Sequence, residues 1–428
     1  MILFTSGGLL ILLSLSIPVG IVLFLLAMGI DIFFSPFPLM RGLGQIVWSS
    51  SNSATLIAIP FFVLLGEVLV RSGVAQRTYS ALESWVSWLP GGLIHANIAT
   101  ATLFSATSGS SVATAATVAS VAMPQAEKLG YDPKLFSGAI AAGGTLGIMI
   151  PPSINLIVYG FLTQTSIPKL FLAGLVPGLF LAVLFMVVTA VLCTINPSLG
   201  GPGVKSNWSK RLTGLVDLIP LLGLFGTIVG SIYAGLATPT EAAAIGVAMA
   251  FAIAAIQNFK AITRDMIVES LKGTVRTTSM IMLVVIGAYV LNFVLTASGV
   301  SRLLQEFLQD LGIGAFATLM VIIAIYIVLG FFIETLSLMV ATIPIIVPII
   351  IQLGYDKIWF GILMIILVEM ALITPPVGLN LYVVQAVRKS GRFTDVMIGV
   401  IPYAIAMLVM VGLLIIFPSI ALYLPSNF

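Results

Sequence analysis

Two consecutive prolines, Pro151-Pro152, lie in a stretch that carries no charge from residue 135 to residue 168. Each proline removes a backbone donor and clashes with the preceding turn, so a helix that crosses this stretch must break there. Freed carbonyl oxygens at such a break could bind a hard cation such as sodium, and the N-terminus of the next helix could bind a carboxylate. In lipid, irregular backbone is tolerated only where it lines a protein cavity, so we interpret the break as part of a ligand site. A plain kink is the alternative, but it needs only one proline and no glycines, whereas three glycines that loosen the preceding turns are present: Gly143, Gly144 and Gly147.

The break has a counterpart in the second half of the chain. The Gly-Tyr-Asp of residues 130–132 recurs at residues 354–356, and the proline pair recurs as Pro375-Pro376, in both cases 224 residues later. Paired broken hydrophobic segments in two halves of a chain are the best sequence indication of the binding site of a secondary transporter. We therefore expect two repeats with one broken helix each, near residues 135–165 and 358–386.

The composition places these segments in a membrane. Of the 428 residues, 60% are hydrophobic and 8% are charged, which is typical of a polytopic membrane protein and excludes a soluble protein. We expect a lipid bilayer around the chain and no nucleic acid partner. One cysteine and one histidine exclude a disulfide framework and a His/Cys metal site, and we expect no organic cofactor. An intramembrane enzyme would need a nucleophile and a base or a metal pair, and a channel would not need twinned broken helices, so we favour a carrier over both.

Charge-free windows of about 20 residues predict the membrane helices. Residues 1–30 carry no charge and lack the basic start of a signal peptide, so we expect a retained first helix. A flexible loop that opens with Gly200-Gly201 separates the two halves. Besides the two broken helices, we expect spans near residues 5–30, 54–71, 170–195, 215–234, 238–257, 277–297 and 396–422.

Two further segments have polar centres and short apolar arms. Residues 92–126 centre on the sequence Thr-Ser-Gly-Ser-Ser at 107–111, and residues 315–352 centre on residues 330–335, at the same position of the repeat. An arm of about 15 residues gives about 22 Å of helix, which is less than the hydrocarbon thickness of about 30 Å. We therefore predict two re-entrant hairpins that turn at mid-membrane. The alternative is that each of these segments crosses the membrane twice as two full spans, which leaves the topology unchanged.

The placement of Lys and Arg predicts the topology, because these residues concentrate on the cytoplasmic side. With a cytoplasmic N-terminus and a periplasmic C-terminus, fourteen of the eighteen Lys and Arg residues lie on the cytoplasmic side. Only four lie outside: Arg41, Lys169, Arg302 and Lys357. This arrangement predicts an all-α polytopic fold of two inverted-topology repeats at 1–200 and 238–428, with a linking loop and helix at 201–237. Inverted repeats whose hairpins enter from opposite sides are the geometry of an alternating-access carrier.

The motifs resemble those of the large membrane subunit of tripartite ATP-independent periplasmic (TRAP) transporters along essentially the whole chain. They are SGSSVATAA at 108–116, GTLGIMIPPS at 144–153, ATPTEAAA at 237–244, ET at 334–335 and TPPVGLN at 374–380. The resemblance implies sodium-coupled, elevator-type import of a small carboxylate (a C4-dicarboxylate, sialic acid or another sugar acid) across the bacterial inner membrane. It also implies two partners, a small four-helix membrane subunit on a separate chain and a periplasmic substrate-binding protein. A self-sufficient divalent-anion/sodium symporter of similar architecture is the alternative.

The hairpin tips and the breaks supply candidate ligands for at least two sodium ions, because carbonyls at unwound helix ends suit this cation. Helix N-termini that face the midplane suit a substrate carboxylate, and an asparagine follows each proline pair closely. The sodium candidates in the first half are Ser105, Ser108, Gly109, Ser110, Gly144, Gly147, Met149 and Pro151. Those in the second half are Gly330, Glu334, Thr335, Ala371, Thr374 and Pro376. The substrate candidates are Ser108, Ser110, Pro152, Asn155, Thr335, Pro375 and Asn380.

Two acidic residues, Glu334 and Glu369, lie in apolar segments, where a functional role and a structural hydrogen bond are equally good interpretations. Glu67 precedes Arg71 by four residues, which favours an ion pair. Residues 238–241 favour a capping box. Residues 72–91 and their counterpart at 298–313 mix apolar and polar side chains at helical spacing. We predict that they are surface helices that couple the hairpins to a static scaffold, with ordinary interfacial helices as the alternative.

Overall fold

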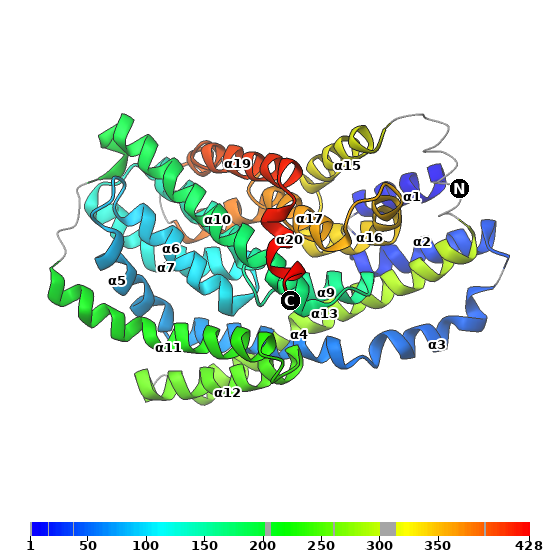
Figure 1. Cartoon of the computed structure of the whole chain (residues 1–428), viewed down its shortest axis with the longest axis horizontal. Helices are drawn as coiled ribbons and strands as arrows, with labels where there is room; N and C mark the ends of the chain where they lie inside the picture. Colours follow the sequence, from blue (N-terminus) through cyan, green and yellow to red (C-terminus); the bar gives the residue numbers. More distant parts are fainter. Residues whose placement is uncertain are drawn as a thin grey trace.

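The computed structural model is helical throughout the parts of the chain it describes, which are residues 2–15, 17–36, 38–201, 207–259, 262–299, 314–388 and 391–428. Within these ranges, seven helices are long and apolar enough to cross a membrane, or eight if one bent pair counts as a single span. In Figure 1, helices line the lower and the upper edges of the molecule, and both long and short helices lie between them. The all-helical membrane fold predicted from the composition is confirmed.

The N-terminal apolar stretch forms two helices, so the prediction of one span at 5–30 is wrong. α1 (Ile2–Ser14) and α2 (Val19–Phe34) are separated at Pro18, which cannot continue the hydrogen-bond ladder of the preceding helix. α3 (Leu39–Ser51) has no counterpart among the predicted spans. It begins where the carboxylate oxygens of Asp31 accept the backbone N–H of Leu39 at 2.9 and 3.0 Å.

Both predicted hairpins are pairs of consecutive helices of 16 to 19 residues that meet at the polar centres. α6 (Leu93–Ser108) and α7 (Ser111–Leu129) meet at Gly109, whose φ of 56° favours glycine. α15 (Ala315–Gly330) and α16 (Thr335–Gln352) form the second pair, and α16 is one of the seven helices long enough to cross a membrane. Figure 1 places α6 and α7 to the left of centre and α16 to the right, with α9 (Ile154–Thr163) and α17 (Lys357–Ala371) between them.

The two proline pairs lie between helices, as predicted. α8 (Pro133–Met149) ends before Pro151-Pro152, and α9 continues beyond it at an angle of 41°. α17 ends before Pro375-Pro376, and α18 (Leu379–Val387) follows. Both proline–proline peptide bonds are cis.

The repeated Gly-Tyr-Asp is explained by helix capping. A carboxylate oxygen of Asp132 accepts the N–H of Leu135 at 2.8 Å in the first turn of α8. A carboxylate oxygen of Asp356 accepts the N–H of Ile358 at 2.7 Å in the first turn of α17. The repeat thus marks the start of each broken helix, because an aspartate at this position satisfies otherwise unpaired N–H groups.

The other helices differ from the predicted spans mainly at their ends. The expected span at 396–422 is two helices separated near Pro418, and the span expected at 277–297 begins at Arg264. Glu67 and Arg71 form the expected ion pair at 2.9 Å, and Thr238 and Glu241 form the expected capping box. The helices are α4 (Ala54–Arg71), α5 (Val74–Val86), α10 (Ile167–Ile195), α11 (Trp208–Tyr233), α12 (Pro239–Asn258), α13 (Arg264–Ala297), α19 (Phe393–Ile416) and α20 (Ser419–Ser426).

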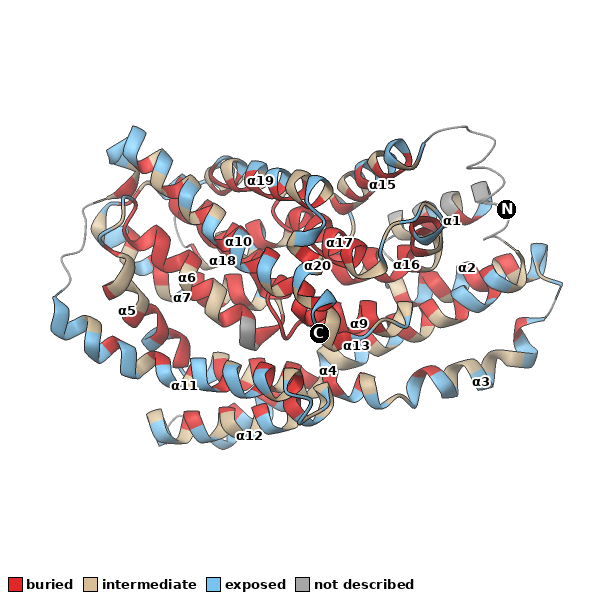
Figure 2. Ribbon diagram, in the orientation of Figure 1, coloured by how far each residue is buried: buried red, intermediate tan, exposed pale blue. Residues whose placement is uncertain are grey.

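The glycines of α8 allow close packing, and the expectation that they loosen the helix is wrong, because α8 is continuous to Met149. A Cβ at Gly144 would lie 2.7 Å from the Cβ of Ala115 in α7. A Cβ at Gly147 would lie 2.8 Å from the carbonyl oxygen of Ser110 at the hairpin tip. Glycine therefore lets the first hairpin approach the backbone of α8, which is buried from Leu135 to Met149. Figure 2 shows that buried residues gather in the middle of the molecule and exposed ones on the outer helices.

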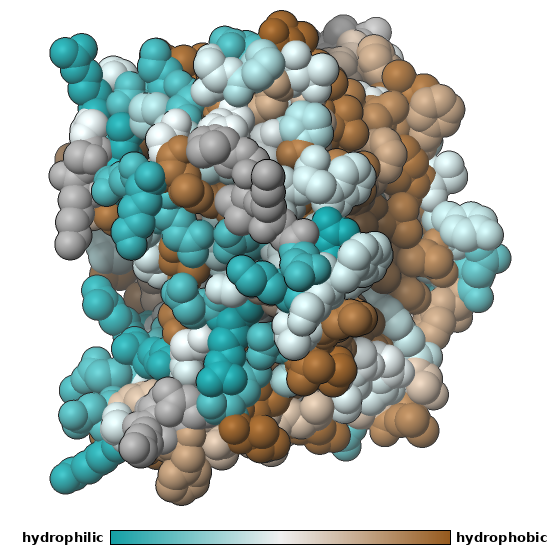
Figure 3. Space-filling view, turned by 90° about the vertical axis from the view of Figure 1, so that its left-hand side faces the viewer, coloured by the Kyte–Doolittle hydropathy of each residue, from teal (hydrophilic) through white to brown (hydrophobic). Residues whose placement is uncertain are grey.

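α5 occupies the position of the predicted surface helix and is bonded to two long helices. The indole N–H of Trp85 donates to the carbonyl oxygen of Arg211 in α11 at 3.0 Å. Arg77 donates to the carbonyl oxygen of Gln257 in α12 at 2.8 Å. Figure 3 views this end of the molecule, where hydrophilic residues gather on one side and hydrophobic residues on the other. The predicted counterpart at 298–313 lies outside the described residues from 300 onward.

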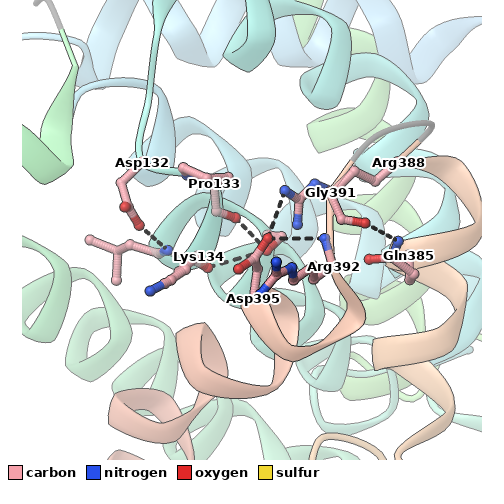
Figure 4. A network of polar contacts seen from close by, with 10 residues as sticks. Asp132, Pro133, Lys134, Gln385, Arg388, Gly391, Arg392 and Asp395 are labelled. Atoms are coloured by element: carbon pink, nitrogen blue, oxygen red, sulfur yellow. Dashed lines mark hydrogen bonds and ion pairs between the residues drawn. The ribbon is translucent and has the colours of Figure 1, made fainter.

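A partly buried ion pair fixes the connection between α18 and α19 beside the start of α8 (Figure 4). Arg388 donates to a carboxylate oxygen of Asp395 at 3.0 Å, and the backbone N–H of Arg392 donates to the same oxygen at 3.2 Å. The amide of Gln385 donates to the carbonyl oxygen of Gly391 at 3.2 Å. The C-terminal end of the second broken helix is thereby tied to α19.

Candidate functional site

A cavity of about 110 Å³ lies where the two hairpin tips and the two breaks converge. The first hairpin contributes residues 109–112, and the second contributes residues 334–336. The first break contributes Ile148, Ile154 and Asn155, and the second contributes Leu372. α13 closes the cavity with Thr277, Met280 and Ile281. Segments far apart in the chain therefore form one site at the position that the repeat pattern predicts.

The starts of three helices face this cavity, and they differ in charge. α7 is capped by Ser110, whose hydroxyl accepts the N–H of Ala113 at 3.4 Å, and α9 is capped by the hydroxyl of Ser153. α16 is capped by the carboxylate of Glu334, which accepts the N–H groups of Leu336 and Ser337 at 3.1 and 3.0 Å. At α16, the negative charge of a carboxylate therefore offsets the partial positive charge of the helix N-terminus. At α7 and α9 the capping group is a neutral hydroxyl, so the partial positive charge of those helix ends is not offset by their caps.

Asn155 is a polar side chain of the cavity whose amide nitrogen is buried and unpaired. It is 4% exposed, and its Nδ2 has no hydrogen-bond partner in the structure. A buried donor without a partner costs roughly 1–3 kcal/mol, so its retention needs an explanation. A carboxylate in the cavity would accept from Nδ2 and from the first N–H groups of α7 and α9.

Five of the predicted site residues line the cavity, and the others do not. Ser108 shares a hydrogen bond with Thr114 at 2.7 Å, and the hydroxyl of Ser105 donates to the carbonyl oxygen of Ala101 at 2.6 Å. Those on the cavity surface are Gly109, Ser110, Asn155, Glu334 and Thr335. Those not among the lining residues are Ser105, Ser108, Gly144, Gly147, Met149, Pro151, Pro152, Gly330, Ala371, Thr374, Pro375, Pro376 and Asn380.

Asn380 follows its break as Asn155 does, but its amide is already engaged. Its Nδ2 donates to the carbonyl oxygen of Ala141 in α8 at 3.1 Å, and the residue is fully buried. The two asparagines, which occupy similar positions in the sequence, therefore have different surroundings. Asn380 ties α18 to α8, whereas Asn155 faces the cavity.

The tip of the first hairpin is held on three sides. The backbone of Ser108 lies against Gly66 in α4, where a Cβ would be 3.0 Å from the Cα of Ser108. Gly147 of α8 supports Ser110 from another side. On a third side, the hydroxyl of Ser111 donates to a carboxylate oxygen of Glu369 in α17 at 2.5 Å. Glu369, for which function and structure were open alternatives, thus makes a hydrogen bond to the first hairpin.

We did not predict from the sequence that α13 lines one side of the cavity. Thr277 and Thr278 begin a polar run, Thr-Thr-Ser, inside an apolar helix, and this run is the signal that could have indicated it. The other missed lining residues are apolar or adjacent to predicted ones: Ser111, Val112, Ile148, Ile154, Met280, Ile281, Leu336 and Leu372.

A larger cavity, of about 670 Å³, lies at the starts of α4, α10 and α12. It is lined by residues 53–55, 164–168 and 238–241, with Gly160 and Phe161. None of the predicted site residues lines it. We place the functional site in the smaller cavity, because that cavity gathers both tips, both breaks and a buried unpaired donor.

Comparison with known proteins agrees with this architecture. The family model "Tripartite ATP-independent periplasmic transporter, DctM component" matches residues 6–420. The C4-dicarboxylate TRAP transporter large permease protein DctM of Pseudomonas aeruginosa is 34% identical over 92% of this chain and 91% of its own length. The sialic acid TRAP transporter large permease protein SiaM of Vibrio cholerae is 31% identical over 97% of this chain and 96% of its own length.

A solved structure shares the fold. The Alcanivorax borkumensis YdaH transporter superimposes with a TM-score of 0.59 at 14% identity, over 97% of this chain and 99% of its own. The sequence relatives are permeases, so the expectation of a transporter rather than an enzyme is confirmed.

Proposed function

Because the chain belongs to the DctM component family of the tripartite ATP-independent periplasmic transporters, we propose that it imports a small carboxylate together with sodium across a bacterial inner membrane. The observation that carries the proposal is the cavity between the two hairpin tips, with its buried and unpaired amide donor on Asn155. Two relatives are named for a C4-dicarboxylate and for sialic acid, which are both carboxylates, and we extend that class to this chain.

The substrate carboxylate binds between the starts of α7 and α9. Those helix ends present N–H groups capped only by serine hydroxyls, and Asn155 adds a side-chain donor. Ser110 and Thr335 supply hydroxyls from the two tips. The volume of about 110 Å³ is below the roughly 300 Å³ at which drug-sized ligand pockets begin, so this state suits a small acid.

Sodium balances the charge of the site. The described residues that line the cavity include the carboxylate of Glu334 and no Lys, Arg or His. A substrate anion would therefore enter a cavity that already holds a negative charge and has no basic side chain. At least two sodium ions, held by Glu334 and by carbonyl and hydroxyl oxygens at the tips and breaks, supply the missing positive charge. These are oxygen ligands, and in the described part of the chain no cluster of three His, Cys, Asp or Glu side chains offers another kind of metal site.

Transport proceeds by elevator-type alternating access between two inverted repeats, with the N-terminus in the cytoplasm and the C-terminus in the periplasm. The support for this proposal is that each half contains one hairpin and one broken helix, and that α13 lies against both tips at the cavity. We assign the hairpins and broken helices to the moving part and α4, α11, α12 and α13 to the scaffold.

The partners we propose are a small four-helix membrane subunit on a separate chain and a periplasmic binding protein that delivers the acid. Both follow from membership of a tripartite family. A self-sufficient symporter remains the second candidate, because the cavity itself contains the groups that would hold an acid and its ions.

The test is uptake into proteoliposomes that contain this chain and its small membrane partner. Succinate, sialic acid and other sugar acids are supplied with and without a sodium gradient, and with and without the periplasmic binding protein. We expect uptake of one acid that requires both sodium and the binding protein. Uptake without the binding protein would assign the chain to the self-sufficient symporters, and uptake that ignores the sodium gradient would refute the sodium sites.

A further inference from the structure

Glu369 is a buried acid that contacts the first hairpin from the opposite half of the chain. It lies in α17, three residues before the cavity-lining Leu372, and it is 1% exposed. Its Oε2 accepts the hydroxyl of Ser111 at 2.5 Å across a separation of 258 residues, and its Oε1 has no partner. An apolar side chain would fill this position in an apolar helix at lower cost, because burying a carboxyl with one hydrogen bond is unfavourable.

Ser111 is the first residue of α7 and lines the cavity. The hydrogen bond that caps this helix, from the N–H of Ala113 to the hydroxyl of Ser110, is long at 3.4 Å. This nitrogen–oxygen distance exceeds the 2.7–3.2 Å at which such bonds are strong. The short bond to Glu369 is therefore the stronger polar restraint on the first turn of α7.

Glycines allow close backbone contact on two other sides of this tip. Gly66 lies against Ser108, and Gly147 lies against Ser110, and a glycine has no side chain that could bond the tip. The hydroxyl bond between Ser108 and Thr114 lies within the hairpin and does not join it to another helix. The hydrogen bond from Ser111 to Glu369 does so, because it joins the tip to the helix that ends at the second break.

We propose that Glu369 is a positioning residue that holds Ser111, and with it the first turn of α7, in the orientation that receives the substrate carboxylate. The inference deepens the proposed function and rests on it for the identity of the ligand. Glu369 does not line the cavity and touches neither substrate nor ion in this role. It acts through Ser111.

The experiment compares Glu369→Leu, Glu369→Gln, Ser111→Ala and the double variant Glu369→Leu/Ser111→Ala in the full chain. Hydrogen exchange of the amides of residues 111–115 in detergent micelles reports the order of the first turn without any substrate. Uptake of succinate and of sialic acid by the same variants, in the presence of the small membrane subunit and the binding protein, reports KM and maximal rate. Tyr403→Phe is the matched control, because it removes another buried hydrogen bond between helices, the one between the hydroxyls of Tyr403 and Thr189 at 2.8 Å, away from the cavity.

We expect Glu369→Leu to speed exchange at residues 111–115 and to raise KM by about tenfold, with little change in maximal rate. Glu369→Gln keeps an acceptor for Ser111 and should restore both values to within about threefold of the parent. The double variant should resemble the single variants, because both remove the same bond. Tyr403→Phe should change neither readout.

Three results would overturn the inference. Unchanged exchange in Glu369→Leu would show that the bond does not order the turn, whatever the protein transports. Faster exchange with unchanged KM would reduce the bond to a structural role. Equal loss in Glu369→Gln and Glu369→Leu would show that the charge of Glu369, and not its contact with Ser111, is needed. If the parent protein takes up no carboxylate, the proposed function fails separately, and the exchange data alone decide whether Glu369 orders the hairpin.

Discussion

Replacing Asn155 by leucine should make the empty protein more stable and a poorer transporter. In the structure, Nδ2 of Asn155 is buried and unpaired, and such a donor costs the folded protein roughly 1–3 kcal/mol. Leucine has a similar size and no polar atoms, so Asn155→Leu should raise the free energy of unfolding by about 1 kcal/mol. A thermal melt of the detergent-solubilised protein without substrate measures this gain.

The same substitution removes one donor to the substrate carboxylate. A hydrogen bond to a charged group contributes roughly 1.5–3 kcal/mol, and each 1.4 kcal/mol corresponds to a factor of ten. We therefore expect KM to rise by about 12- to 140-fold in a proteoliposome uptake assay. Asn155→Asp should be worse, because it replaces the donor by a second carboxylate beside Glu334.

Thr100→Val provides the control for this prediction. The hydroxyl of Thr100 in α6 is also buried and unpaired, but the residue does not line the cavity. The substitution should stabilise the protein and leave KM unchanged. If Asn155→Leu instead lowers the melting temperature, or leaves KM within about threefold of the parent, the amide has another partner and the carboxylate site is not where we place it.

Three other substitutions test separate parts of the structure. Glu334→Ser keeps a side chain that can cap α16 but removes the negative charge, so the variant should still fold. The sodium concentration that gives half-maximal uptake should rise at least about tenfold. An unchanged sodium dependence would show that Glu334 only caps the helix. Burial raises the pKa of Glu83 in α5 above its ordinary value, while nearby Lys210 opposes the shift, so ionising Glu83 costs the folded state and stability falls as the pH rises through the raised pKa. Glu83→Gln should therefore melt higher than the parent at pH 8, with the difference shrinking toward pH 4, and a difference independent of pH would contradict this cause. Asp395→Asn removes the charged partner of Arg388 in a partly buried ion pair and should cost roughly 1–3 kcal/mol in thermal unfolding. The double variant Arg388→Met/Asp395→Leu should recover most of that loss, and equal melting of the two variants would show that the ion pair does not hold α18 to α19.

The sequence was sufficient to predict the features that depend on local chemistry. Paired prolines end helices wherever they occur, so the breaks near Pro151 and Pro375 were predictable from the chain alone. The polar centre of the first hairpin was predictable for a similar reason, since a glycine flanked by serines interrupts an apolar helix, and that of the second because Glu334 and Thr335 interrupt an apolar segment. The early break at Pro18 was missed because a single proline can also be accommodated inside a helix, as Pro60 is in α4.

Features that depend on packing partners were not predictable. A glycine can loosen a helix or allow a close approach, and only the position of Ala115 and Ser110 opposite α8 shows that the second applies. Asn155 and Asn380 look equivalent in the sequence, yet a carbonyl from α8 lies beside one of them alone. α13 lines the cavity because it passes both hairpin tips, and no local sequence pattern indicates that arrangement.

The length of α13 has a mechanical consequence. Its 34 residues give a rod of about 51 Å, while the hydrocarbon layer is about 30 Å thick, so about 20 Å must extend beyond it or be taken up by tilt. The midpoint of the rod falls at residues 280–281, and Met280 and Ile281 are two of the three residues by which α13 lines the cavity. Because we assign α13 to the scaffold, it stays in place while the hairpin tips move past it, and its midpoint is the part of the rod farthest from both ends. The cavity therefore meets α13 where the moving tips have the most scaffold on either side.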